Sequence, residues 1–194
     1  MEAHFEKIIS ELERRPLPTN RDRKTTGVGK TQVFGVVNRR CCKPDYSVMC
    51  WERPLLYLLL LEFGKHFISI SWNTITVNQN YQCGIHRDKN NSGDSVLVAF
   101  GDFSGGELEI HEGNLKGIHN IKHTLFQTDF SQTYHSVLPF QGNRYSLVYY
   151  YYPTQTELPP PSVKFENGQY VFYRGSSCER LNDHPLKNRI ITDK

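Results

Sequence analysis

The sequence lacks the features that mark secreted or membrane-bound proteins. Its longest apolar run, PLLYLLLLEF, is too short to span a bilayer. The first residues, MEAHFEKIISELERR, contain no continuous apolar stretch of the kind found in secretory signals. The five cysteines include no CxxC pair, which argues against a zinc or disulfide framework. We therefore expect reduced thiols in an intracellular protein, which would be nuclear in a eukaryote, and no membrane partner.

The composition is otherwise that of an ordinary globular protein. The chain has 194 residues and 38% hydrophobic content, enough for one domain with a sizeable core. Its 11 tyrosines and 11 phenylalanines favour β structure. We expect a monomer with N-terminal helices and a basic loop over residues 1–66. A β-rich core over 67–152 follows, and then a Pro-rich exit, a β-hairpin and a tail over 153–194.

Positive charge is concentrated near the N-terminus. The net charge is only +3, but the segment from Arg14 to Lys43 holds nine basic residues and a single acid, Asp22. Such a block is the electrostatic footprint of a polyanion partner such as nucleic acid, although a solvated arm would have the same composition. The candidate nucleic-acid contacts in it are Arg21, Arg23, Lys24, Lys30, Arg39 and Arg40.

Periodicity predicts the main elements. Apolar residues at helical spacing predict a helix over 2–14, and a second helix, opened by Pro54, is predicted over 54–66. Alternating, β-branched segments from Phe67 onward, separated by turns such as PFQGN, predict a sandwich or barrel. NG in SVKFENGQYVFYR predicts a hairpin. GVGKT at 27–31 has Lys24 where a phosphate-binding loop needs glycine, so we interpret it as a flexible basic loop.

The segment YQCGIHRDKNN carries the first chemical signal. His86 and Asp88 are two residues apart at the end of a predicted strand, so both side chains can face one point. His135 begins a later strand and is the candidate for a third ligand. Two histidines and one carboxylate are the ligand set of non-haem Fe(II) sites that leave coordination positions open.

Arg144 and Ser146 are a second candidate pair, two residues apart on the strand after His135. An arginine that points into a β-barrel must meet a carboxylate, because an unpaired buried charge is costly. An internal acid, a bound carboxylate ligand or a structural salt bridge at the end of the barrel could each supply it.

These residues together carry a family resemblance. The pattern HRD, GDFSGGEL and YHSVLPFQGNRYSLVYYYY resembles the double-stranded β-helix (jelly-roll, cupin-like) core of Fe(II)/2-oxoglutarate-dependent dioxygenases, over roughly residues 67–152. The resemblance implies that His86, Asp88 and His135 bind Fe(II). It also implies that Arg144 pairs with the distal carboxylate of 2-oxoglutarate and that Ser146 helps to hold it.

Further cofactor contacts follow less specifically from the resemblance. Asn78, Asn80 and Tyr81 precede the metal residues and are candidates for contacts with 2-oxoglutarate. O2 would be the second cosubstrate, and ascorbate a candidate reductant.

Within this superfamily, HRDKNNSGDSVLVAFGDFSGGELEI most resembles the TET/JBP branch, which oxidises the methyl group of 5-methylcytosine or thymine in DNA. The basic segment agrees with DNA as the partner. The chain lacks the Cys-rich region of animal TET enzymes, so its grip on DNA would come from elsewhere. Hydroxylation of a protein side chain, as by prolyl hydroxylases, or of a small molecule stays open, as does a non-catalytic cupin-like binding module.

Two further patterns are interpreted as structural. The tyrosine run 149–152 should alternate between the two faces of the last core strand and pack there. His119 and His123, four apart in a segment predicted as loop and strand, are interpreted as a solvated pair rather than a metal site.

Overall fold

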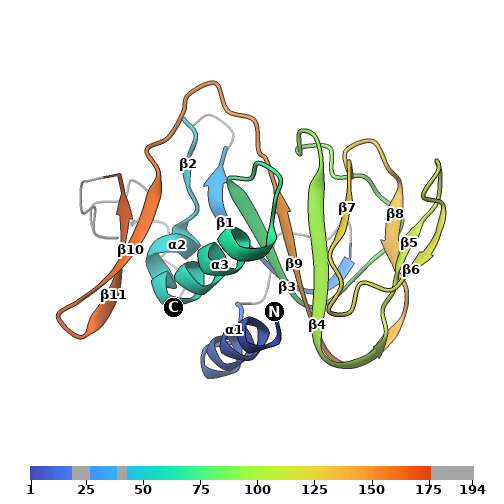
Figure 1. The fold of residues 1–194 in the computed structure, drawn as a ribbon, viewed down its shortest axis with the longest axis horizontal. Coiled ribbons are helices and arrows are strands. Elements are labelled where there is room, and N and C mark those ends of the chain that lie inside the picture. The colour runs from blue at the N-terminus through green and yellow to red at the C-terminus, as the bar shows by residue number, and fades with distance from the viewer. Residues whose placement is uncertain (19–26, 39–42, 176–194) are drawn as a thin grey trace.

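Two antiparallel sheets form the centre of the molecule. The computed structural model describes residues 1–18, 27–38 and 43–175. The larger sheet has the strand order β2 (Asp45–Tyr46), β1 (Gly27–Val37), β3 (Thr74–Cys83), β9 (Phe140–Tyr150), β4 (Ser95–Gly105) and β7 (Phe126–Thr128). The smaller sheet has the order β6 (Gly117–His119), β5 (Leu108–Ile110) and β8 (His135–Val137). This is the mainly β, double-stranded β-helix architecture that the sequence predicts, with helices on the outside (Figure 1).

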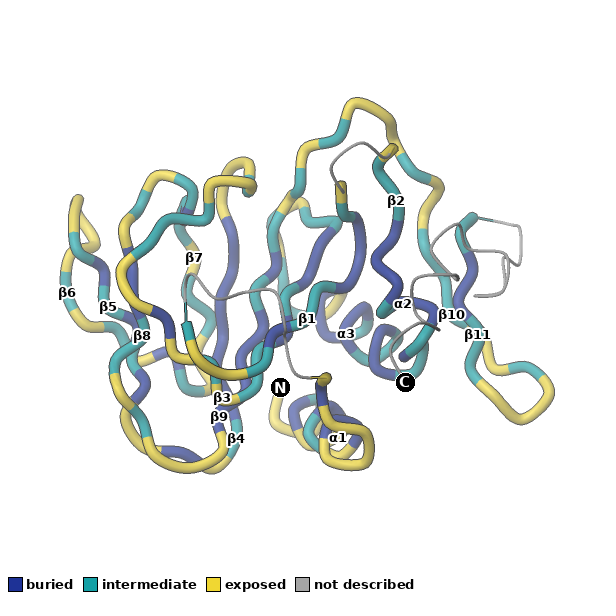
Figure 2. Tube along the Cα trace, turned by 180° about the vertical axis from the view of Figure 1, so that it is seen from behind, coloured by how far each residue is buried: buried dark blue, intermediate teal, exposed yellow. Residues whose placement is uncertain are grey.

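Helices cover one face of the larger sheet. They are α1 (Glu2–Arg14), α2 (Val48–Glu52) and α3 (Pro54–Phe67). Phe5 of α1 stacks on Phe100 of β4, with ring centroids 4.5 Å apart. The Tyr149 hydroxyl donates a hydrogen bond to the Leu60 carbonyl oxygen at 2.7 Å. Figure 2 shows buried residues along β3, β4 and β9 and on the helices, with exposed turns at the edges. None of the described helices is long and apolar enough to cross a membrane.

Alternation along β9 separates the core from the pocket. Tyr145, Leu147 and Tyr149 belong to the hydrophobic cluster shared with the helices. Residues of the opposite parity, Arg144 and Ser146, line the cavity between the two sheets. The period of two along a strand therefore turns one sequence segment into both a helix-packing surface and a site wall.

The predicted helices over 2–14 and 54–66 are confirmed, but three local predictions are wrong. GVGKT is the start of β1 and not a loop, because pairing with β3 supplies its hydrogen bonds, with a register shift between Val28 and Lys30. The segment after Phe67 becomes strand only at Thr74. PFQGN lies largely within β9, where Gly142 allows close approach to β4; a Cβ there would collide with the Asp102 carbonyl oxygen.

The predicted hairpin is confirmed in β10 (Pro161–Glu166) and β11 (Gln169–Arg174). Asn167 and Gly168 adopt φ angles of 50° and 80°, as the two-residue turn requires. Phe172 packs against Trp51 of α2 with ring centroids 4.6 Å apart. The hairpin is therefore joined to the helical layer, on the side away from β5 and β8 (Figure 1).

Candidate metal centre and its pocket

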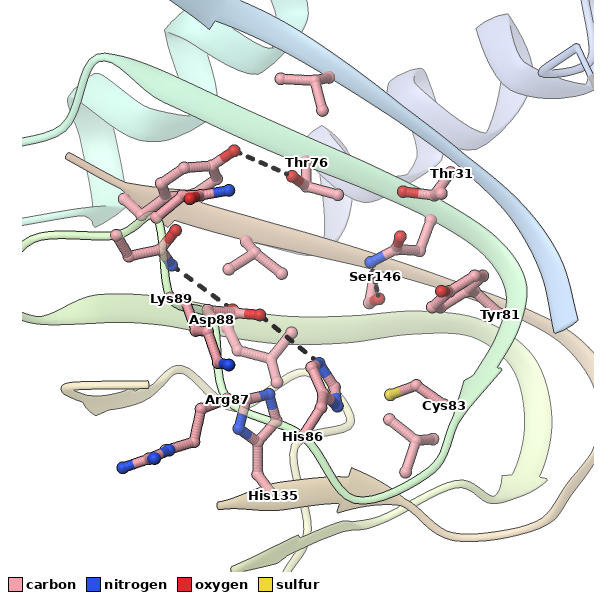
Figure 3. A pocket seen from close by; sticks show the side chains of 18 of the residues that line it. Thr31, Thr76, Tyr81, Cys83, His86, Arg87, Asp88, Lys89, His135 and Ser146 are labelled. Carbon is pink, nitrogen blue, oxygen red and sulfur yellow. Dashed lines mark hydrogen bonds and ion pairs between the residues drawn. The ribbon is translucent and has the colours of Figure 1, made fainter. Parts of the chain in front are cut away.

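The structure brings His86, Asp88 and His135 together. One ligand atom from each of the three lies within 4.8 Å of the others, and no second group of this kind occurs in the described ranges. Figure 3 shows their side chains converging at the wall of the pocket. His119 and His123 take no part in such a group: His123 Nδ1 lies 3.2 Å from a Glu2 carboxylate oxygen, and His119 Nε2 lies 2.6 Å from the Leu115 carbonyl oxygen.

Main-chain hydrogen bonds hold the three side chains in place. The backbone N–H groups of His86 and His135 each donate to the other residue's carbonyl oxygen at 3.0 Å, which forms an isolated antiparallel bridge. The Asp88 N–H donates to the Phe130 carbonyl oxygen at 2.9 Å. The HRD segment is thus fixed to β8 although it is not itself a regular strand.

The ring nitrogens are oriented for metal binding. Nδ1 of His86 lies 2.9 Å from the Gly84 carbonyl oxygen, and Nδ1 of His135 lies 3.0 Å from that of Thr133. A carbonyl oxygen only accepts, so both Nδ1 atoms carry the proton and both Nε2 atoms face the site. Asn91 Nδ2 donates to Asp88 Oδ2 at 3.4 Å and orients the carboxylate.

Without a metal, the two histidines differ in their protonation. The hydrogen bond with Asp88, and secondarily one with the Cys83 thiol, raises the pKa of His86 to about 11. Burial lowers the pKa of His135 below its ordinary value. His86 therefore holds a proton at neutral pH in the position that a cation would take, whereas His135 is neutral.

Arg144 is the largest fully buried side chain of the described chain, with 1% exposure. Its guanidinium lies between Phe103 and Phe140, 5.5 Å and 5.6 Å from their ring centroids. Its Nε and Nη2 atoms are buried and make no hydrogen bond with the described residues. Burial lowers the pKa of Arg144 to about 10, so the group stays charged at neutral pH. The sequence left open what meets this charge, and no described carboxylate forms an ion pair with it.

A cavity of about 750 Å³ connects the triad with Arg144 and Ser146. Of the candidate cofactor contacts, Asn78 and Tyr81 line it, and Asn78 Nδ2 donates to Ser146 Oγ at 3.2 Å. Asn80 does not line it; its Oδ1 accepts a hydrogen bond from the Arg144 backbone N–H at 2.7 Å. Asn80 therefore supports the arginine strand from outside the cavity.

Many residues that line the pocket were not assigned to the site from the sequence, among them Thr31, Cys83, Tyr150 and Tyr152. Thr31 is buried and its hydroxyl has no hydrogen-bond partner among the described residues. Cys83 is a buried free thiol beside His86. Tyr150 and Tyr152 line the cavity, while Tyr149 is buried and Tyr151 is 40% exposed. The rings of the tyrosine run point to different sides as predicted, but the interpretation of the run as packing alone is wrong for Tyr150 and Tyr152, which line the pocket.

The nucleic-acid contacts predicted from charge fall mainly outside the described residues, namely Arg21, Arg23, Lys24, Arg39 and Arg40. Lys30 lies in β1, opposite Gln79 of β3, and does not line the cavity. Asn38, the last described residue before Arg39, does line it. Their role in binding stays a prediction.

Comparison of the sequence with family models and with curated proteins finds no match. The structure is similar to an oxidoreductase of the 2OG-Fe(II) oxygenase family from Burkholderia pseudomallei, with 20% identity and a TM-score of 0.51, covering 74% of this chain and 75% of that one. It is also similar to NgTET1 in complex with 5mC DNA, with 16% identity and a TM-score of 0.51. The match covers 78% of this chain and 67% of the NgTET1 chain. The chain therefore has the fold of the 2OG-Fe(II) oxygenases.

Proposed function

We propose that the protein is an Fe(II)- and 2-oxoglutarate-dependent dioxygenase. The observation that carries the proposal is the buried Arg144 guanidinium, which lines the same cavity as the triad and has no ion-pair partner in the described chain. An uncompensated buried charge is costly, and a planar guanidinium is suited to a carboxylate. A dicarboxylate that reaches from Arg144 to the metal residues would neutralise it.

The donor set of the triad fits Fe(II). Two imidazole nitrogens and one carboxylate are the ligands that non-haem Fe(II) oxygenases use, and they leave open positions. His86, Asp88 and His135 would hold the ion. When bound, iron and 2-oxoglutarate would supply the oxidation of a substrate C–H bond by O2, with release of succinate and CO2, and ascorbate would keep the metal reduced.

The chain's own residues bind, orient and exclude water. Arg144 holds the distal carboxylate, and Ser146, fixed by Asn78, lies on the same wall of the cavity. Phe103 and Phe140 keep the guanidinium dry, which strengthens its attraction for an anion. Asn91 holds the Asp88 carboxylate in its orientation.

We further propose that the substrate is the 5-methyl group of 5-methylcytosine or thymine in DNA. Tyr150 and Tyr152 give aromatic rings to the cavity that the triad also lines, and stacking on such rings suits a base removed from the helix. The amides of Asn38 and Asn90 offer donors and acceptors to a base edge. The similarity of fold to NgTET1, solved with 5mC DNA, agrees with this substrate.

The first experiment is succinate production. The purified protein is incubated with Fe(II), 2-oxoglutarate and ascorbate, alone and with methylated, unmethylated or thymine-rich oligonucleotides, and the digested nucleosides are analysed by mass spectrometry. Succinate stimulated by one oligonucleotide, together with its hydroxylated nucleoside, is the expected result. Succinate without a modified base would retain the dioxygenase and replace DNA by a protein or small-molecule substrate. No succinate under any condition would overturn the proposal.

A further inference from the structure

Arg87 lies between two of the metal residues and takes no part in the triad. Because His86 and His135 are opposite one another in an antiparallel bridge, the neighbouring pair is Arg87 and Tyr134, whose side chains face the other way. The Arg87 guanidinium carbon lies 4.3 Å from the centroid of the Tyr134 ring. Both residues line the cavity, and Figure 3 shows the Arg87 side chain extending past His135, away from Cys83.

The Arg87 guanidinium has no acidic partner in the part of the chain that the structure describes. It forms no ion pair with any described residue, and its buried Nε makes no hydrogen bond there. Two carboxylates near this part of the chain are otherwise engaged. Asp88 faces His86 at 3.5 Å, and Glu112 Oε1 accepts a hydrogen bond from the Tyr134 backbone N–H at 3.1 Å. The guanidinium is thus held by the tyrosine ring with donors left for a ligand.

The charges of the cavity favour a second anion. Its lining contains three cations, Arg87, Lys89 and Arg144, and one carboxylate, Asp88. A divalent metal and dianionic 2-oxoglutarate cancel one another, so two positive charges remain after both are bound. Arg144 is engaged by the cosubstrate, and the unmatched charge therefore belongs to Arg87 and Lys89.

We propose that Arg87, held against Tyr134, binds a phosphate of the substrate at the cavity mouth. A guanidinium can grip phosphate oxygens with two parallel hydrogen bonds, and the stacked ring fixes the plane of that fork. This inference rests on the proposed function, because the anionic group closest to a reacting base is its own phosphate. The phosphate belongs to a nucleic-acid strand or to a free nucleotide, which share this chemistry.

Binding of a deoxynucleoside 5′-monophosphate and of a short single-stranded oligonucleotide to the full chain tests the site. Titrations are made at several salt concentrations, with and without Mn(II) and 2-oxoglutarate. Arg87→Gln should raise the Kd for the monophosphate and for the oligonucleotide about tenfold. It should also reduce the magnitude of the slope of log binding constant against log salt concentration by about 0.7 for the oligonucleotide. The affinity of Arg87→Lys should lie between those of the wild type and Arg87→Gln, because the charge stays but the planar fork is lost. Tyr134→Leu should weaken binding more than Tyr134→Phe, because the phenylalanine keeps the ring under the guanidinium.

Lys164 provides the matched control. Its ammonium lies 4.7 Å from the Tyr173 ring centroid, so it repeats the cation–ring pair on the β10–β11 hairpin. Lys164→Gln removes the same charge and should leave the Kd and the salt slope unchanged. Circular dichroism checks that each variant is folded, and the Lys variant of Arg87 keeps the test informative if the Gln variant is not.

The experiment separates a nucleic-acid strand from a free nucleotide as the source of the phosphate. It also separates failure of the Arg87 phosphate site from failure of the proposed dioxygenase. Equal affinity for monophosphate and oligonucleotide would assign the site to a nucleotide, and tighter oligonucleotide binding to a nucleic-acid strand. An Arg87→Gln variant with the wild-type Kd and salt slope would overturn the phosphate site, as would equal binding of an oligonucleotide with uncharged methylphosphonate linkages. By contrast, failure of the Mn(II)-loaded wild type to bind 2-oxoglutarate would overturn the proposed dioxygenase.

Discussion

Gly106 lies directly against the Arg144 guanidinium. A Cβ built on residue 106 would lie 2.8 Å from Arg144 Nε and 2.9 Å from its Cδ. Gly106, the last of the three glycines in GDFSGGEL, is therefore part of the arginine pocket, because only a residue without a side chain leaves the Arg144 guanidinium its position beside Phe103 and Phe140.

Gly106→Ala should weaken 2-oxoglutarate binding by at least tenfold, since the added methyl displaces Arg144 from the cavity. It should also lower the free energy of unfolding by about 1–3 kcal/mol, because residue 106 has a φ of +72°. Gly113→Ala is the matched control: its φ is +75° and nothing lies within 4 Å of the new Cβ. Thermal unfolding and calorimetric titration would measure both effects, and equal 2-oxoglutarate affinity in the two variants would contradict the clash.

Arg144→Met should separate stability from cosubstrate binding. The variant removes a buried charge that lacks an acidic partner in the described chain, so the protein without ligand should unfold at a higher temperature. The same variant should lose about 2–4 kcal/mol of 2-oxoglutarate binding free energy, roughly a 30- to 800-fold rise in Kd. Differential scanning fluorimetry with and without 2-oxoglutarate measures both. A variant that is destabilised and still stabilised by 2-oxoglutarate would refute this role.

His135→Ala should remove metal binding while leaving the fold largely intact. The side chain contributes one of three ligand atoms, and two remaining ligands hold a divalent ion much more weakly. Titration with Co(II), followed by its visible absorption, measures the loss. His119→Ala removes a histidine outside the triad and should bind Co(II) as the wild type does. Equal Co(II) affinity in both variants would exclude His135 as a ligand.

Metal binding should release a proton and tighten as pH rises. The Asp88 hydrogen bond raises the pKa of His86, so His86 is protonated at neutral pH and must lose that proton to bind a metal. Burial lowers the pKa of His135, which is already neutral and adds no proton. Mn(II) affinity should therefore rise about tenfold per pH unit between pH 7 and 8. Calorimetry in two buffers of different ionisation enthalpy counts the proton, and a count of zero would contradict the protonated His86.

Tyr150→Ala should uncouple 2-oxoglutarate turnover from substrate. Tyr150 lines the cavity and its hydroxyl lies 3.4 Å from Thr76 Oγ1, so its loss removes a ring from the substrate chamber. We expect the stimulation of succinate formation by the oligonucleotide to fall about tenfold, as for the loss of one base-stacking contact. Tyr151 is the next residue, is 40% exposed and does not line the cavity, so Tyr151→Ala should keep the stimulation of succinate formation. Equal losses in both variants would argue for a general effect on the end of β9 and the residue after it, and against a specific role of the Tyr150 ring.

Hydrophobic periodicity and turn residues in the sequence predicted much of the fold. The helices at 2–14 and 54–66 and the Asn-Gly hairpin follow local rules, because helical spacing, the first-turn position of Pro54 and φ preference act over a few residues. The start of β1 does not follow from local pattern: the GVGKT segment is strand because β3 pairs with it. The glycines of PFQGN and GDFSGGEL read as turn residues, and only the packed structure assigns Gly142 and Gly106 to close contacts.

For the candidate site as well, the sequence determined some relationships and only the tertiary structure decided the others. The spacing of Arg144 and Ser146 determined that these side chains share a face of β9, because strand alternation is a local property. His86 and Asp88 also converge, but outside a regular strand, where backbone hydrogen bonds to His135 and Phe130 hold them. Only the tertiary structure decided that His135 joins His86 and Asp88, that no described acid meets Arg144, and that Arg87 lies on Tyr134. Those relationships depend on which distant strands become neighbours, and the free energy of the whole core, not of any one segment, sets that pairing.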